Sequence, residues 1–477
     1  MPEHDEADWY EREERAGIQA DGDPAAMVDG AFVEHCTDVG NARRFALHHG
    51  ERLRYVDALG GWHVYDGRRW QRDDTGEVFR LWEETGRAIY QEAALAGTRD
   101  EREALAAWAR KSESRARVEA AIALARYQPS IAARAADFDK NPWLLNLLNG
   151  TLDLQADTLR AHRREDLITK LAPVTFDPSA TAPTFEAMVN RIFDNRIALI
   201  AFVQRFVGHA LTGLTTEQVL LLLHGIGANG KTTFVELIRA LLGDYAQTAD
   251  FGTFLAHDQV TVRNDLARLV GARLVSAVEM SRGGRLDESV VKQVTGGDMI
   301  TARFLFREHF EFRPAFKLVL VSNHKPRIGG TDYAIWRRVR LVPFDVIIPE
   351  DERDPLLLQR IIATELPGVL NWALDGCREW QGNGLGIPED VKVATETYRK
   401  EQDLLAPFLA EQCIEKPNAT ATAAQLYSAF KAWAERAGER PISQRTLGES
   451  LRERGFQNEH TREGNIWRGL SVKGEGS

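Results

Sequence analysis

The sequence predicts an α/β protein, with a parallel sheet in the middle of the chain, a mostly helical region before it and a smaller mixed region after it. Short apolar runs alternate with segments of helical periodicity, which is typical of strands buried on both faces of a parallel sheet. The chain has 477 residues, enough for about three domains. Apolar residues make up 44% of it and charged residues 27%, as in an ordinary globular protein.

Composition also indicates where the protein does not act. No apolar stretch is long enough to span a membrane, and the acidic start MPEHDEADWYEREERAG lacks the apolar segment of a secretion signal. We therefore expect no membrane partner and a cytoplasmic location. Cys36, Cys377 and Cys413 lie far apart in the sequence, so neither a disulfide framework nor a zinc site is expected.

The net charge of −10 is unevenly distributed. Residues 1–30 hold ten acids and two bases, which leaves −2 for the remaining 447 residues. Residues 301–340 reverse the balance, with nine bases and three acids. Such a run is either a solvated face or a surface that contacts nucleic acid. The acidic total is therefore no argument against a nucleic-acid partner.

The first half of the chain divides into two predicted regions. Residues 1–30 are dense in charge and poor in apolar residues, which predicts a disordered acidic tail. Residues 31–175 form a predicted, mostly helical domain. In this domain GGWHVYDGRRW favours a hairpin at Asp66-Gly67, residues 81–138 favour one or two amphipathic helices, and residues 141–154 favour two strands with a turn at Asn149-Gly150. Two prolines in residues 176–185 mark a boundary.

Residues 176–385 are predicted to hold the parallel sheet. A helical segment, 186–212, leads to the apolar run Val219–Leu223, a glycine-rich loop and a helix over about Lys231–Leu242. Further strands are predicted at 272–279, 316–323 and in VRLVPFDVII. The first two of these end in polar residues, as expected where the carboxyl ends of strands carry a site. After the linker QGNGLGIPED, residues 386–477 favour helices around 391–412, 422–437 and 443–455, then a strand in NIWRGLSV.

The glycine-rich loop GIGANGKT, Gly225–Thr232, fits the phosphate-binding pattern G-x-x-x-x-G-K-[ST] between a strand and a helix. The N–H groups of such a loop point into one concavity, and its lysine, here Lys231, reaches the terminal phosphates of a nucleotide. The Thr232 hydroxyl is a predicted Mg²⁺ ligand, and a purely structural turn is the alternative. The full set of residues predicted to bind ATP is Gly225, Gly227, Ala228, Asn229, Gly230, Lys231, Thr232 and Thr233.

Two polar residues at predicted strand ends complete a catalytic site. Glu279 is placed to polarise an attacking water or to help hold the metal. Because Val278 stands where many ATPases carry an aspartate for Mg²⁺, either Glu279 serves both roles or Mg²⁺ relies on Thr232 and waters. Asn323, in VSNHKP, is placed to hydrogen-bond the γ-phosphate and the water. The alternatives are a solvated strand cap for Glu279 and a turn-forming residue for Asn323.

Two arginines follow the third predicted strand. Arg337 and Arg338 precede the strand-like VRLVPF, and either could reach a neighbouring subunit's γ-phosphate as a catalytic finger. Ordinary surface arginines are the alternative. A finger acting between subunits requires head-to-tail contacts, which close into a ring.

These motifs, together with GNARRFALHHG, GWHVYDGRRW, NLLNGTLDL, FVGHALTG and VVKQVTGGDMITARFLF, resemble the helicase half of the phage and plasmid DNA primase/helicase family. This family is a branch of the superfamily 3 helicases within the AAA+ ATPases. The resemblance covers about residues 41–470. It implies an AAA+ P-loop ATPase core flanked by a helical amino-terminal domain and a winged-helix-like carboxy-terminal domain.

The resemblance implies an ATP- and Mg²⁺-dependent DNA helicase of a phage, prophage or plasmid. It would form a ring, expected to be a hexamer, and move on single-stranded and forked DNA in a bacterial cytoplasm. Lys231, Glu279 and Asn323, with Arg337 or Arg338, take the catalytic roles. A β-hairpin near GGDMITARFLF, with its tip near residues 307–309, is implied to grip DNA. The residues implied to contact DNA phosphates are Lys292, Arg303, Arg307 and His309.

Relatives often begin with a primase module, and the acidic stretch of about 30 residues ahead of the helical region is too short for one. We therefore expect a separate primase or polymerase as partner. In ISQRTLGESLRERG, helix-turn-helix character and Arg445, Arg452 and Arg454 suit duplex contact, with a protein–protein role as the alternative. Rival functions are a remodelling or DNA-packaging motor that does not unwind, an origin-binding protein that uses ATP for assembly, and a small-molecule kinase.

Overall fold

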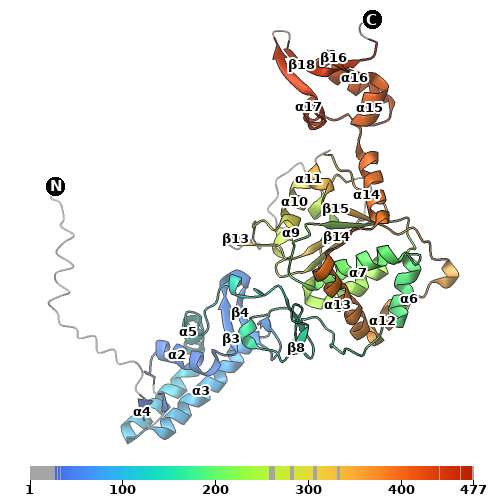
Figure 1. Ribbon diagram of the computed structural model, residues 1–477. Coiled ribbons are helices and arrows are strands. Elements are labelled where there is room, and N and C mark those ends of the chain that lie inside the picture. The colour runs from blue at the N-terminus through green and yellow to red at the C-terminus, as the bar shows by residue number, and fades with distance from the viewer. Residues whose placement is uncertain are drawn as a thin grey trace, which may run out of the picture. The chain divides into compact units, whose positions relative to one another are not determined.

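The computed structural model describes residues 27–28, 31–32, 34–256, 264–279, 284–303, 309–329, 333–439, 441–461 and 464–474. Its mixed helices and strands, with a parallel sheet, confirm the predicted α/β class (Figure 1). The chain forms two compact units. One comprises the residues up to Asp66 with Gln71–Ala135, and the other comprises Gly67–Trp70 with Ala136–Ser477. No helix in these described ranges is long and apolar enough to cross a membrane.

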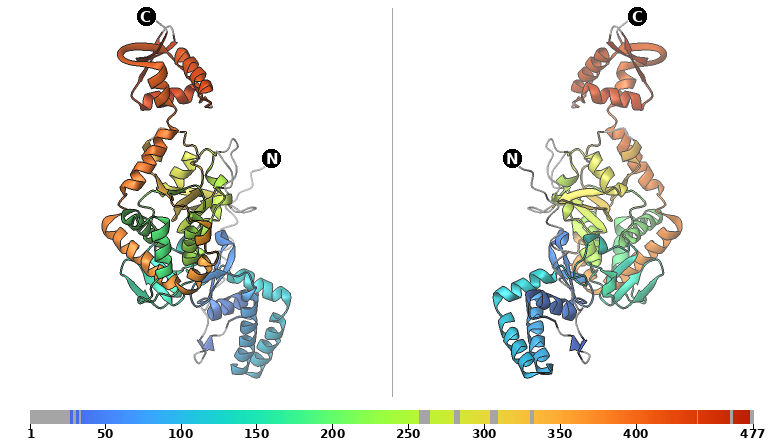
Figure 2. Two further views of the ribbon diagram at one scale, coloured as in Figure 1. Left: turned by 90° about the vertical axis from the view of Figure 1, so that its right-hand side faces the viewer. Right: turned by 90° about the vertical axis from the view of Figure 1, so that its left-hand side faces the viewer.

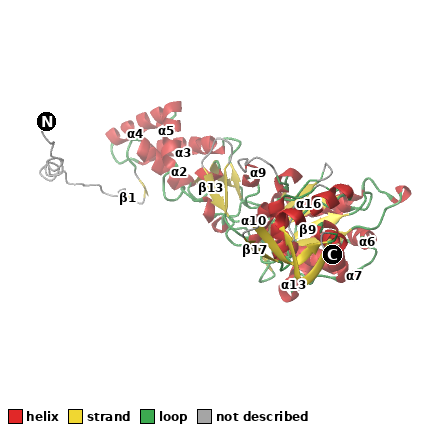
Figure 3. Ribbon diagram, turned by 90° about the horizontal axis from the view of Figure 1, so that it is seen from above, coloured by secondary structure: helices red, strands yellow, loops and turns green. Residues whose placement is uncertain are grey.

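The amino-terminal unit is mostly helical, as expected, and its helices group together in the red ribbons of Figure 3. The Asp66-Gly67 turn joins two strands, β4 and β5, and Gly67 has the positive φ of +94° that this turn requires. The predicted helical region 81–138 holds three helices, because Thr98 and Ser114 begin new ones. The elements are β1 (Met27–Val28), β2 (Ala31–Phe32), α2 (Asp38–His49), β3 (Leu53–Val56), β4 (Gly61–Tyr65), β5 (Trp70–Arg72), α3 (Glu77–Leu95), α4 (Arg99–Ser112) and α5 (Arg115–Ala125).

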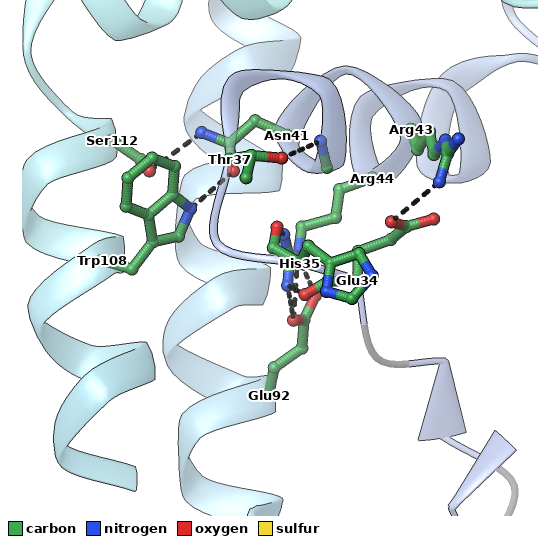
Figure 4. Close-up of polar contacts among 10 residues, drawn as sticks. Glu34, His35, Thr37, Asn41, Arg43, Arg44, Glu92, Trp108 and Ser112 are labelled. Atoms are coloured by element: carbon green, nitrogen blue, oxygen red, sulfur yellow. Dashed lines mark hydrogen bonds and ion pairs between the residues drawn. The ribbon is translucent and has the colours of Figure 1, made fainter. Parts of the chain in front are cut away.

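Polar side chains tie α2 to α3 and α4 (Figure 4). Arg44 is fully buried, and its guanidinium donates to both carboxylate oxygens of Glu92 at 2.7–2.9 Å. Asn41 donates to the hydroxyl of Ser112 and accepts from the indole N–H of Trp108, both at 2.9 Å. Buried polar groups that are fully paired in this way fix the helices in one arrangement.

The second unit begins with a small antiparallel sheet. NLLNG forms the predicted turn, and a third strand follows the two predicted ones. Leu145, Leu147 and Leu152 from this sheet are buried in the same core as the helices that follow. For this reason the division between units lies near residue 135 rather than at the expected 175. The strands are β6 (Leu144–Leu147), β7 (Gly150–Asp153) and β8 (Thr158–Arg160).

A five-stranded, fully parallel sheet of order β10-β11-β14-β9-β15 forms the centre of the second unit. The four expected strands are present, and β10 is a short addition at the edge. Alternate leucines of β9 face two different cores, so the sheet is buried on both faces. The strands are β9 (Leu220–His224), β10 (Ala246–Thr248), β11 (Leu274–Val278), β14 (Lys317–Ser322) and β15 (Val339–Pro343).

Helices cover both faces of this sheet, and α7 and α13 lie side by side (Figure 2). An antiparallel hairpin, β12–β13, stands apart from the central sheet. The elements are α6 (Pro183–Ile192), α7 (Ile197–Leu211), α8 (Lys231–Leu242), α9 (Asn264–Ala267), α10 (Glu288–Gly296), β12 (Ile300–Arg303), β13 (His309–Phe312), α11 (Tyr333–Trp336), α12 (Leu357–Thr364), α13 (Leu366–Asn383) and α14 (Glu389–Gln402).

A third core defines the carboxy-terminal module, which starts near residue 404 rather than 386. The expected helix 391–412 is two helices, because the Asp403 carboxylate accepts from the N–H groups of Leu405 and Ala406 and starts a new one. Tyr398 of the first helix is buried in the core of the central sheet. The module contains α15 (Leu405–Gln412), β16 (Cys413–Thr422), α16 (Ala423–Arg436), α17 (Gln444–Glu453), β17 (Gln457–Thr461) and β18 (Gly464–Val472), with sheet order β16-β18-β17.

Candidate functional site

The glycine-rich loop lies where the sequence predicts it, between β9 and α8. Gly227 and Gly230 have φ of +87° and +80°, and Ala228, at +49°, shares this left-handed conformation, which is uncommon for alanine. The Ala228 carbonyl accepts from the N–H of Ile348 at 2.8 Å, which holds the loop against the segment after β15. No side chain caps the start of α8 at Gly230. The N–H groups of the first turn are therefore available to an anion.

The glycines of the loop differ in whether the surrounding structure leaves space for a side chain. A Cβ on Gly225 would lie 2.3 Å from the Phe344 carbonyl oxygen, and one on Gly230 would lie 2.6 Å from a methyl carbon of Ile192. Around a Cβ on Gly227 there is open space. Gly225 and Gly230 are therefore required for packing, whereas Gly227 leaves the concavity of the loop open. This arrangement fits a bound phosphate group.

Lys231 is the first residue of α8 and is 4% exposed. Its Nζ donates to the Gly225 carbonyl at 2.7 Å, to Asn229 Oδ1 at 3.0 Å and to Asn323 Oδ1 at 3.1 Å. Burial lowers the pKa of Lys231. A desolvated ammonium held only by neutral oxygens is well suited to bind an anion that replaces some of them.

Glu279 and Asn323 follow β11 and β14, which are parallel neighbours, and so lie at the same edge of the sheet as the loop. The Glu279 N–H donates to the Val321 carbonyl at 2.9 Å, and its carboxylate accepts from the Ser322 hydroxyl. Burial raises the pKa of Glu279. The structure therefore brings Lys231 and Asn323 into contact and places Glu279 one strand away.

The predicted metal ligands, Thr232 and Glu279, would supply only part of the coordination shell of a metal ion. Thr232 is exposed in the first turn of α8, and Glu279 is half-buried. Among the described residues, no group of three or more His, Cys, Asp or Glu side chains could hold a metal ion. The residues present fit a cation that is held largely by phosphate oxygens, as Mg²⁺ commonly is.

Arg337 and Arg338 have opposite environments. The Arg338 side chain is 7% exposed; it donates to the Thr295 hydroxyl at 3.2 Å and to the Ala334 carbonyl at 2.8 Å. Arg337 is exposed. The N–H of Leu220, at the start of β9, donates to the Arg338 carbonyl at 2.8 Å, so both arginines lie at the edge of the sheet opposite the glycine-rich loop.

The expected DNA-contacting hairpin exists, but part of it lies outside the described residues. Arg303 of β12 pairs with His309 of β13, so His309 belongs to a strand rather than to the predicted tip. Arg307 lies outside the described residues. Lys292, on α10, is 4.0 Å from Glu288. Of these four residues, the structure describes the side chains of Lys292 and Arg303 only, so the predicted set of DNA-contacting residues stays a prediction.

Two contributions were missed by the sequence analysis. The loop motif predicts a role only for the N–H of Asn229. Its side chain also accepts from Lys231 Nζ and donates to the Phe344 carbonyl, which links the two. Ser322, the last residue of β14, contacts Glu279 and also accepts from the His324 N–H at 2.8 Å. A polar residue at the end of an otherwise apolar strand was the available signal for Ser322.

Comparisons with known families cover the regions that hold this site. A family model described as "D5 N terminal like" matches residues 42–194, and a model of a family of unknown function, DUF5906, matches residues 223–338. A putative helicase of Acanthamoeba polyphaga mimivirus is 25% identical over 321 residues, which are 62% of this chain and 33% of the relative. A putative primase of African swine fever virus is 26% identical over 323 residues, with the same coverage.

Together these matches support a relationship to the phage and viral primase-helicase family. A further relative, a putative helicase of Frog virus 3, is 30% identical over 258 residues, or 49% of this chain and 26% of the relative. The chain thus spans about a third of the length of the curated primase-helicase relatives that it matches.

A solved structure resembles nearly the whole fold of this chain. The apo structure of the NrS-1 C-terminal region superposes with a TM-score of 0.50 and 10% identity, covering 91% of this chain and 99% of that one. At this identity the likeness concerns the fold alone.

Proposed function

We propose that the protein is an ATP-dependent DNA helicase of superfamily 3, built on an AAA+ core, that acts in viral, phage or plasmid DNA replication. One observation carries the proposal: the phosphate-type loop, Lys231 and Asn323 meet at one edge of a parallel sheet with Glu279 beside them. Relatives named as putative helicases and primases support it. The order helix, strand, two helices, two strands in the carboxy-terminal module supports a winged-helix-like domain.

In this proposal the loop and the first turn of α8 bind the phosphates of ATP. Lys231 exchanges contacts with neighbouring oxygens for phosphate oxygens, and the exposed Thr232 hydroxyl, with Glu279, would hold Mg²⁺. Bound ATP with Mg²⁺ supplies the phosphoryl group that is transferred to water. Glu279 orients that water and accepts its proton, and Asn323 positions the water for in-line attack.

The position of Arg337 supports a ring of subunits. It lies beside the start of β9, and the loop begins five residues further on, about 17 Å away at 3.3 Å per strand residue. Arg337 is thus too far to serve its own nucleotide site. An exposed arginine at the opposite edge can serve a neighbour's site only in head-to-tail contact, which closes into a ring; we propose a hexamer. The buried, hydrogen-bonded Arg338 is the weaker candidate for the finger.

The hairpin β12–β13 is the proposed contact with single-stranded and forked DNA. Lys292, Arg303, Arg307 and His309 supply cations that would neutralise backbone phosphates and release counterions. The central role of these residues is electrostatic, so DNA binding should weaken steeply with salt. A separate primase or polymerase is the proposed replication partner.

The test is the variant Lys231→Ala, with Lys392→Ala on the surface of α14 as the matched control. We expect Lys231→Ala to reduce ATP hydrolysis and strand displacement on forked DNA to background, with an unchanged circular dichroism spectrum, and Lys392→Ala to keep both. DNA-stimulated hydrolysis that persists in Lys231→Ala would overturn the proposal. Hydrolysis without strand displacement in the natural chain would instead favour a motor or origin-binding protein that does not unwind.

A further inference from the structure

The carboxy-terminal module contains a hollow that the proposed helicase mechanism does not use. It lies between α17 and the strands β17 and β18 and has a volume of about 290 Å³. Leu447 and Trp467, both nearly fully buried, form its floor. Gly448 lies in the middle of α17, where glycine costs about 1 kcal/mol relative to alanine. A Cβ there would lie 3.4 Å from the indole of Trp467, in ordinary van der Waals contact, so helix and strand pack closely at this point.

The walls of the hollow are polar and basic. Arg445 and Arg452 contribute guanidinium groups, and none of the described residues that line the hollow is acidic. The Arg452 guanidinium lies over the Trp467 ring at 5.7 Å from its centre. Arg445 Nε donates to Glu449 Oε1 at 2.9 Å, an exposed pair that contributes little to stability.

Three carboxamides complete the walls: Gln444 on α17, Asn458 on β17 and Asn465 on β18. The Oδ1 of Asn465 is already in contact with the His460 ring nitrogen at 3.0 Å, which leaves its amide N–H groups directed elsewhere. Carboxamides offer both donors and acceptors, as the edges of nucleobases do.

We infer that this hollow binds one nucleotide of single-stranded DNA. Its volume is close to the lower end of small-ligand pockets, about 300 Å³. The Arg452 guanidinium, held within cation–π distance of the Trp467 indole, is a flat cation on which a base can stack, and the second arginine can hold a phosphate. The inference rests on the proposed function in that DNA is the substrate.

Shape and charge favour a single strand over a duplex. Duplex reading by this kind of module uses a projecting helix that enters the major groove, whereas this feature is concave. Residues 405–477 hold ten bases and nine acids, so the module lacks the excess positive charge that tracks a long duplex. A few arginines gathered around one hollow match a single nucleotide better.

The inference is tested on the full chain by photo-crosslinking to an oligonucleotide that contains 4-thiothymidine, followed by mapping of the crosslinked peptide. We expect a crosslink on the peptide that carries Asn458 or Trp467. The double variant Arg445→Ala/Arg452→Ala should bind a fluorescent oligothymidine about tenfold more weakly, with a shallower salt dependence. Lys431→Ala, which removes an exposed cation of α16 in the same module, is the control and should bind normally.

Each outcome decides between readings. If the double variant melts early, Asn458→Ala replaces it, since this truncation on a surface strand removes a carboxamide without removing charge. Absence of the crosslink in a chain that hydrolyses ATP and unwinds DNA overturns the inference and leaves the proposed function intact. A crosslink in a chain without hydrolysis overturns only the proposed function. If the double variant binds only a blunt duplex more weakly, the module contacts duplex DNA instead of a single strand. If it binds both the oligothymidine and the duplex normally, the hollow serves a protein partner.

Discussion

Arg337 and Arg338 show how neighbouring residues of one type acquire different roles. The Arg338 guanidinium is buried and donates to Thr295 and Ala334, so it connects α10 and α11 to the start of β15 within one subunit. Arg337 faces solvent. The sequence pattern treats the two as equivalent, because burial depends on which side of the chain packs against α10.

This difference predicts opposite effects on stability. We expect Arg338→Ala to lower the free energy of unfolding by about 1–3 kcal/mol, because it leaves buried hydrogen-bonding groups without their partner. Arg337→Ala should change it by less than about 0.5 kcal/mol, as surface substitutions usually do. Urea unfolding followed by circular dichroism measures both. Equal destabilisation by the two variants would contradict the assignment.

Glu279 leads to a prediction about pH. Burial raises its pKa, so the folded chain binds this proton more readily than the unfolded chain does. The carboxyl must be ionised to accept a proton from water, and hydrolysis should therefore fall on the acid side at a higher pH than for an ordinary glutamate.

The same shift has a consequence for stability with a definite sign. A pKa that is higher in the folded chain than in the unfolded chain stabilises the fold at pH values below the unfolded-state pKa. This stabilisation is lost as the pH rises through the folded-state pKa. Glu279→Gln, which cannot ionise, should therefore gain melting temperature relative to the natural chain at pH 8 and lose that advantage at pH 4. Differential scanning fluorimetry across this range measures it. If the two proteins differ in melting temperature by the same amount at both pH values, the result would contradict the raised pKa.

At the scale of elements, the amino-terminal helices depend on a buried ion pair. Arg44 on α2 and Glu92 on α3 meet in bidentate geometry (Figure 4). Removing one partner leaves a buried charge without compensation, so Arg44→Ala should cost about 3–5 kcal/mol. Arg87 on α3 is exposed and lies 3.8 Å from the exposed Glu83, which makes Arg87→Ala the matched control, with an expected cost below about 1 kcal/mol.

Hydrogen exchange with peptide mapping measures this effect where it occurs. In Arg44→Ala the amides of α2 and α3 should exchange faster, while those of β9 and β14 in the other unit keep their protection. Uniformly faster exchange in both units would indicate that the pair supports the whole chain. Unchanged exchange in α2 would show that helix packing alone is sufficient there.

Local signals explain which elements were predictable. β9, β11, β14 and β15 are apolar runs that are buried on both faces, and the hairpin β12–β13 has alternating residues that match its pairing. β10 has three residues, too few for a periodic signal, and β16 is mostly exposed and has no apolar run. The start of α15 depends on one carboxylate, Asp403, inside an otherwise helical pattern.

At the scale of the whole molecule, the sequence located the site but not its internal contacts. Parallel strands end at a common edge, so a loop motif and two polar strand ends were sufficient to place Lys231, Glu279 and Asn323. The roles of Asn229 and Ser322 arise from contacts with residues distant in sequence, which periodicity does not report. The boundary near residue 135 similarly depends on β6 and β7 joining the core of α6 and α7.

The ring proposal makes the last prediction. If each nucleotide site combines Glu279 of one subunit with Arg337 of the next, Glu279→Gln and Arg337→Ala lie on opposite sides of one interface. Each variant alone should be inactive. In an equal mixture, random assembly gives about a quarter of the interfaces both intact halves, so ATP hydrolysis should return to a measurable fraction of the natural rate.

A second mixture provides the control. Lys231→Ala and Glu279→Gln both damage the loop side of the interface, so no composite site in their mixture is intact and hydrolysis should stay at background. Recovery in the first mixture but not in the second requires an arginine that acts across subunits. If neither mixture recovers while light scattering shows that rings assemble, Arg337 does not serve a neighbouring site. The inactivity of Arg337→Ala would then originate within its own subunit.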